Sequence, residues 1–178
     1  MKKLSIIILP LFFLFFYIFS AMHSFHQVHK SIYYNDKQLS KNYIEWEEVK
    51  KNFKDFFNAN LINKMSHEKE LKDLGELGIL VTGLASKFVD YAIDTYINPE
   101  GLSLLIQKSD KKTEIPKPNL GTLIGGILIM NFDGLSSFYV NLETDGEEIP
   151  VHFKRIGLKW KVVKIEFPDN IFNEMKLN

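Results

Sequence analysis

The sequence contains no cysteine among its 178 residues. This absence excludes disulfide bonds, catalytic thiols, cysteine-rich zinc sites and the acylated cysteine of a bacterial lipoprotein. Arginine is almost absent as well, because Arg155 is the single one, and the chain is therefore poorly equipped for bidentate phosphate recognition. A domain of this length can nevertheless fold on its hydrophobic core alone.

An excess of charge of either sign is also missing. The 22 lysines and arginines balance the 22 aspartates and glutamates, so the chain lacks the basic character of a nucleic-acid-binding protein. We therefore expect no nucleic-acid partner. Apolar residues make up 46% and charged residues 25% of the chain, a composition typical of a globular protein rather than a disordered one.

A long uncharged run, Leu4 to Ala21, dominates the N-terminus. As a helix these residues would measure about 27 Å, close to the ~30 Å hydrocarbon core of a bilayer. Lys2 and Lys3 precede the run and favour a cytoplasmic N-terminus. The sequence predicts a signal anchor over residues 1–21 that crosses the inner (cytoplasmic) membrane once. Residues 22–178 would then form an exported domain in the periplasm or outside the cell.

A cleaved signal peptide is the alternative, and it would release the domain as a secreted protein. A cut after Ala21 places Phe19 three residues before the cut, where a small residue is required. The sequence therefore favours an anchor over cleavage. In either case the domain leaves the cytoplasm.

Helical patterns fill the first two thirds of the remaining chain. Residues 24–35 indicate a short helix that continues from the anchor, and apolar residues at three- and four-residue spacing predict a second helix from Trp46 to Leu61. Ser66 is placed to cap a third helix, whose second half covers residues 79–97. Asn98 and Pro99 have the residue types that begin a fourth helix.

The last third changes to a period of two, which is typical of strands. Alternation predicts strands near residues 138–143, 149–154 and 158–167, with a bulge where the parity shifts at Val162 and Val163. The apolar run from Leu123 to Phe132 is most simply a preceding strand. The predicted fold class is α+β: an N-terminal membrane helix, then three to four helices packed on an antiparallel four-stranded meander. By analogy, this arrangement is cystatin-like or nuclear-transport-factor-like.

Three stretches together resemble a known family. They are the lysine-then-apolar N-terminus, the INPEGLSLLI run at Ile97–Ile106 and the closing RIGLKWKVVKIEFP at Arg155–Pro168. The chain resembles an uncharacterised bacterial family, domain of unknown function 2939, over most of residues 20–168. The resemblance implies a membrane-anchored protein. It brings no activity with it.

A pocket between the helices and the concave face of the sheet is the first candidate site. Its predicted lining is Phe53, Phe88, Phe138 and Trp160, with Arg155 able to form a cation–π pair with Trp160 at the mouth. The alternative is that these apolar residues are simply core. No residue pattern requires a cofactor.

Two sets of polar residues are catalytic or metal-binding candidates. His23, His26 and His29 are spaced three apart, so that two could share a metal, but residues at a membrane interface explain them better. Asp90 and Asp94 are one helical turn apart, yet they fall opposite the apolar side of their helix and should point into water. The sequence therefore predicts no catalytic residue.

These observations favour a non-catalytic, membrane-anchored envelope domain that binds a protein or an apolar ligand. Two alternatives stay open. One is an envelope hydrolase or isomerase, which converging acidic or histidine side chains in a cavity would favour. The other is a structural subunit of a membrane complex, in which Phe12 to Phe19 would pack against partner helices.

Overall fold

The structure is a computed structural model of the chain, and it describes residues 2–67, 75–108, 115–144 and 147–166. Helices come first and strands last. The helices are α1 (Lys2–Tyr33), α2 (Lys37–Tyr43), α3 (Trp46–His67), α5 (Glu76–Tyr96), α6 (Pro99–Lys108) and α7 (Leu120–Leu128). The strands are β1 (Met130–Phe132), β2 (Ser137–Thr144), β3 (Glu147–Ile156) and β4 (Lys159–Ile165).

The four strands form one antiparallel sheet in the order β1-β2-β3-β4, which confirms the predicted meander and the α+β class. The predicted bulge is present as well. His152 pairs with Lys164 and Phe153 pairs with Val162, so Val163 is the extra residue of β4. Gly157 has a φ of +64°, the left-handed conformation that glycine adopts without steric cost in the tight turn between β3 and β4.

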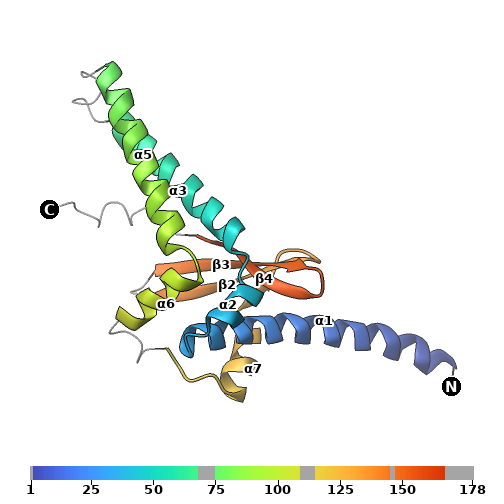
Figure 1. The fold of residues 1–178 in the computed structure, drawn as a ribbon. Helices are drawn as coiled ribbons and strands as arrows, with labels where there is room; N and C mark the ends of the chain where they lie inside the picture. The colour runs from blue at the N-terminus through green and yellow to red at the C-terminus, as the bar shows by residue number, and fades with distance from the viewer. Residues whose placement is uncertain (1, 68–74, 109–114, 145–146, 167–178) are drawn as a thin grey trace.

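The core lies where α1, α2 and the start of α3 cover one face of this sheet (Figure 1). Phe138 and Phe153 stack with ring centroids 4.5 Å apart, and Trp160 lies 5.3 Å from Phe138. The helices add Ala21, Val28, Tyr43 and Val49, and Ile44, between α2 and α3, completes the set. An aromatic cluster of this size explains how the domain folds without disulfide bonds.

Residues 24–33 continue the anchor as the single helix α1, as predicted, and five further helices follow it in the described part of the chain, where three to four were expected. Two sequence-based predictions of elements were wrong. Residue 66 lies inside α3 instead of capping a new helix. Most of the predicted strand Leu123–Phe132 belongs to α7, because Asn119 forms a capping box with Thr122 that begins a helix there.

Two parts of the molecule project from this body (Figure 1). The N-terminal half of α1 extends to one side, beyond the end of the sheet. Helices α3 and α5 pack side by side as a hairpin that extends in a different direction, away from the N-terminus. We call this hairpin the arm.

Candidate binding surface

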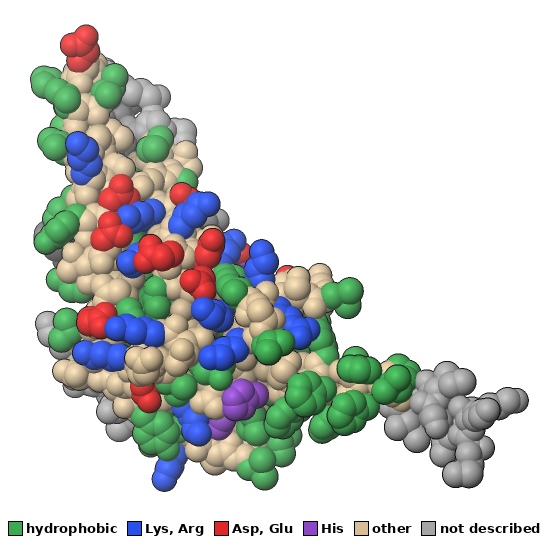
Figure 2. Space-filling model, turned by 45° about the vertical axis from the view of Figure 1, so that its right-hand side comes forward, with side chains coloured by type: hydrophobic (Ala, Val, Ile, Leu, Met, Phe, Trp, Pro, Cys, Tyr) green, Lys and Arg blue, Asp and Glu red, His purple; other side chains and the backbone are tan. Residues whose placement is uncertain are grey.

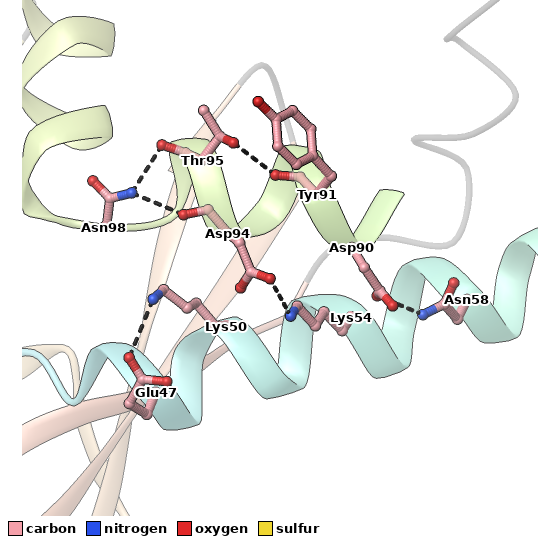
Figure 3. Close-up of polar contacts among 9 residues, drawn as sticks. All are labelled: Glu47, Lys50, Lys54, Asn58, Asp90, Tyr91, Asp94, Thr95 and Asn98. Atoms are coloured by element: carbon pink, nitrogen blue, oxygen red, sulfur yellow. Dashed lines mark hydrogen bonds and ion pairs between the residues drawn. The ribbon is translucent and has the colours of Figure 1, made fainter. Parts of the chain in front are cut away.

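The two helices of the arm are joined through polar side chains. The Ser86 hydroxyl donates to Oδ1 of Asn58 at 2.7 Å. Nδ2 of Asn58 in turn donates to Oδ1 of Asp90 at 3.1 Å, as Figure 3 shows. One turn nearer the sheet, Nζ of Lys54 lies 2.7 Å from Oδ2 of Asp94. The hydrogen bond to Asp94 raises the pKa of the Lys54 ammonium. Polar contacts therefore set how α5 lies on α3.

This arrangement corrects the expectation for Asp90 and Asp94. Both do lie away from the apolar side of α5, as the helical geometry predicts. They also contact α3, however: Asp90 accepts a hydrogen bond from Asn58 and Asp94 pairs with Lys54, while 52% of the Asp94 side chain stays exposed. Several large apolar residues of α5 are consequently left exposed.

Five large apolar residues form a line along the outward side of α5. At about 100° per residue they fall within roughly 80° of arc, centred opposite Ser86 and Asp90. Each is between 60 and 72% exposed. We call this set the α5 stripe; its members are Leu77, Leu80, Leu84, Phe88 and Tyr91.

An exposed apolar line of this length is uncommon on a soluble surface, so the α5 stripe is a candidate binding surface. Figure 2 shows apolar side chains along the edge of the arm, whereas basic and acidic side chains gather nearer its base. The three- and four-residue spacing of the stripe is visible in the sequence. Phe88, predicted from the sequence to line an internal pocket, is exposed here, because spacing alone does not say which side of a helix is covered.

The residues predicted to line a pocket are only partly brought together. Phe138 and Trp160 lie side by side in the core, and Phe53 packs against that core. Phe88 belongs to the exposed α5 stripe. Arg155 is exposed on β3, directly across the strand pair from Trp160.

A groove of about 410 Å³ lies between the start of α3 and strands β2 to β4. Its lining is Glu48, Asn52, Ser137, His152, Phe153, Lys154, Ile156, Val163 and Lys164, so it includes none of the five predicted pocket residues. Beside it, Oε1 of Glu166 lies 2.6 Å from Nζ of Lys164 and 3.1 Å from Nε2 of His152. The hydrogen bond from Lys164 lowers the pKa of Glu166.

The three histidines after the apolar run have separate surroundings. His23 Nε2 lies 3.4 Å from the Tyr43 hydroxyl, and His29 Nε2 lies 2.9 Å from the Pro116 carbonyl oxygen. The His26 and His29 rings are nearly perpendicular, at 80°, with centroids 6.3 Å apart. Within the described residues, no group of three or more histidine, cysteine, aspartate or glutamate side chains is placed to hold a metal.

Helix α1 divides into two parts. It is the one helix of the described chain that is long and apolar enough to cross a membrane or to act as a signal peptide. Residues Leu9–Phe16 are exposed throughout. From Tyr17 onward the helix packs on the domain: the Tyr17 hydroxyl donates to the carbonyl oxygens of Gly134 and Leu135, at 3.3 and 3.1 Å.

The second part of α1 belongs to the core. Ala21 is fully buried, and Nε1 of Trp160 donates to Oγ of Ser20 at 2.9 Å. The backbone N–H of Trp160 donates to Oγ of Ser24 at 3.2 Å. The sequence predicts a separate anchor. In the structure, one helix forms both the exposed apolar N-terminal part, up to Phe16, which we call the apolar projection, and a part of the folded domain.

Comparison with known proteins gives one match. The chain matches the model of a family described as "Protein of unknown function (DUF2939)" over residues 11–105, which is more than half of its length. The match runs from the exposed part of α1 to α6 and includes the whole arm. No curated protein and no solved structure matches the chain.

Proposed function

Because the chain belongs to the DUF2939 family of proteins of unknown function, a membership that assigns no activity, we propose its function from its geometry. The protein is a membrane-anchored, non-catalytic domain that binds a helix of a partner protein. Binding takes place along the α5 stripe. The observation that carries the proposal is the exposure of all five stripe residues on one side of a helix whose other side is held by α3.

The spacing of the stripe supports a helical partner. Its members follow one another at intervals of three, four, four and three residues, the repeat by which two helices pack side chains into each other's gaps. Leu77, Leu84 and Tyr91 are seven residues apart, as in a coiled-coil seam. An apolar side of a partner helix would cover these residues and exclude water from them.

The direction of the arm supports a protein partner rather than the membrane that holds α1. The arm leaves the body of the domain away from the N-terminal half of α1 (Figure 1). A bilayer around Leu9–Phe16 would therefore be remote from the stripe. The arm is suited to reach a partner at a distance from the membrane surface.

The two parts of α1 support anchoring rather than release. Cleavage after Ala21 would remove Tyr17 and Ser20, together with their hydrogen bonds to Leu135 and Trp160. It would also remove a fully buried residue, Ala21, from the core. With Lys2 and Lys3 on the cytoplasmic side, the domain would lie in the periplasm or outside the cell. A topology reporter fused to Asn178 tests this orientation, and activity of a cytoplasmic reporter would contradict it.

The groove supports a second candidate, an envelope hydrolase or isomerase. Glu48, His152 and Lys164 converge on it, and an acid, an imidazole and an ammonium are the groups that general acid–base catalysis uses. The test is whether each variant restores the phenotype of a strain that lacks the protein. If the groove is catalytic, His152→Gln fails to restore it and Leu84→Asp restores it. Binding through the stripe predicts the reverse.

Site-specific photo-crosslinking in cells tests the proposed binding. A photoreactive residue at position 84 should give one adduct with a partner protein, and the adduct should disappear when Leu80→Asp and Phe88→Asp are introduced together. Position 55 is the matched control, because Asp55 is exposed on α3 outside the stripe. Equal crosslinking from positions 55 and 84, or an adduct that survives both charged substitutions, would contradict the proposal. An adduct of two copies of this chain would also contradict it and indicate self-association.

A further inference from the structure

Two leucines at one end of the sheet are almost completely exposed. Leu135, in the loop between β1 and β2, is 91% exposed, and Leu158, in the turn between β3 and β4, is 87% exposed. A leucine at the tip of a tight turn gains nothing for the fold from this position. These two side chains therefore need an explanation outside the packing of the domain.

The two leucines lie at the same end of the molecule. The backbone N–H of Arg155 donates to the carbonyl oxygen of Ser136 at 2.8 Å, which ties the end of β3 to the loop that carries Leu135. Leu158 follows Ile156 and Gly157 in the turn directly after β3. Figure 1 shows this end of the sheet beside α1, on the side toward the N-terminus.

This end of the sheet is level with Tyr17, the point at which α1 first meets the domain. The Tyr17 hydroxyl donates to the carbonyl oxygen of Leu135, and its ring lies 5.5 Å from that of Phe132. The exposed apolar part of α1 ends directly before Tyr17, at Phe16. Leu135 and Leu158, which we call the leucine tips, therefore lie at the level along α1 where the apolar projection ends.

The apolar projection is shorter than the hydrocarbon core of a bilayer is thick. From Leu4 to Phe16 the chain offers 13 residues, or about 20 Å of helix at ~1.5 Å per residue. The hydrocarbon core of a bilayer is about 30 Å thick. The projection alone falls short by roughly 10 Å, because the following residues of α1 are already packed on the sheet.

We propose that the end of the sheet rests in the membrane interface, with Leu135 and Leu158 inserted into the apolar layer beside α1. The inference rests on the proposed anchoring by α1 and adds a second point of contact with lipid. The two tips supply apolar surface at the level where the projection ends, and so reduce the mismatch with the bilayer. The domain would then stand in a fixed orientation on the membrane, with its arm directed away from it.

The charges around the tips suit such a position. Arg155 and Lys159 flank the turn that carries Leu158, and both are exposed, although the Lys159 ammonium also lies 5.2 Å from the centroid of the Tyr43 ring. Long basic side chains place their stems along apolar surface and their charges among lipid phosphates. Asp133, in the loop with Leu135, is the acidic residue next to the tips. Two cations against one carboxylate favour an anionic lipid surface.

Spin labelling tests the inference directly, because the chain has no cysteine to remove. Single substitutions Leu135→Cys, Leu158→Cys, Phe12→Cys and Glu143→Cys are made in the full chain. Each is labelled with a nitroxide and reconstituted into vesicles of phosphatidylcholine and phosphatidylglycerol. Glu143 is the matched control, since it is exposed on β2 toward the opposite end of the sheet. The readout is relaxation of each label by oxygen and by a water-soluble nickel chelate.

The expected result is an order of accessibility. The label at position 12 should relax mainly with oxygen, those at 135 and 158 should be largely shielded from the nickel chelate, and that at 143 should be open to it. If positions 135 and 158 behave like 143 while position 12 is inserted, the inference is overturned and the anchor stands. If position 12 also behaves like 143, the anchor itself fails. Dipolar broadening at 158 would indicate a second copy there and would also overturn the inference.

Discussion

At the scale of single residues, two serines decide how α1 joins the sheet. Ser20 and Ser24 accept hydrogen bonds from the indole N–H and the backbone N–H of Trp160, respectively. Trp160 is fully buried, and a buried N–H without a partner costs roughly 1–3 kcal/mol. Small hydroxyl residues within the apolar helix thus satisfy the largest aromatic side chain of the core.

His26 should make the stability of the domain depend on pH. Burial lowers the pKa of His26, and the positive charges of Lys30, His29 and His23 lower it further. The unfolded chain therefore binds a proton more readily than the folded one. The stabilisation is fully present above pH ~6.5, the usual histidine pKa, and is lost as the pH falls toward the lower pKa of the folded state.

Thermal unfolding between about pH 8 and pH 5 measures this effect. His26→Gln should make the melting temperature less dependent on pH in the acidic part of that range. Lys30→Gln should reduce the dependence only partly, because burial is the larger cause. An unchanged pH dependence in His26→Gln would show that another group is responsible.

At the scale of elements, α5 buries little of its length, since its buried residues are Gly78 and Ile93, and so the arm should open by itself. Asn58 connects both helices, since it accepts from Ser86 and donates to Asp90. Asn58→Ala removes two partly buried hydrogen bonds, each of which contributes about 0.5–1.5 kcal/mol. Amide exchange in α5 should therefore accelerate about tenfold, while exchange in β2 and β3 stays unchanged.

Asp55→Asn provides the control for this prediction, because Asp55 is exposed on the same helix. It should leave exchange in α5 unchanged. If Asn58→Ala accelerates exchange in the strands as strongly as in α5, the arm and the core unfold as one unit and the prediction is wrong.

The elements also show what could be predicted from the sequence. Periodicity located α3, α5, α6 and the three longer strands, because each has apolar residues at the spacing of its own backbone. It failed for residues 123–132, where a short apolar run fits a helix and a strand equally well and the Asn119 cap decides. It also failed for Phe88, because which side of α5 is covered depends on contacts with α3 that are distant in sequence.

At the scale of the whole molecule, the decisive feature is that α1 is continuous from the apolar projection into the core. The sequence indicates a boundary after Ala21, since the uncharged run ends there. The structure moves the boundary between projection and domain to Tyr17, where side-chain contacts with the sheet begin. The difference arises because the buried part of a core helix is as apolar as a membrane helix, and composition alone cannot separate them.

Two N-terminal deletions distinguish these boundaries. A chain that starts at Tyr17 keeps its contacts with Gly134, Leu135 and Trp160, so it should fold cooperatively but bind vesicles much more weakly, through Leu135 and Leu158 alone. A chain that starts at His23 loses Tyr17, Ser20, Ala21 and Met22. Removing a large core-contacting side chain alone costs about 3–5 kcal/mol. Native domains are stable by only about 5–15 kcal/mol, so the four losses together should abolish cooperative unfolding.

Circular dichroism and thermal melts of both chains provide the measurement. Equal melting temperatures would mean that the domain folds without the first part of α1, and cleavage after the apolar run would then be compatible with a folded, secreted protein.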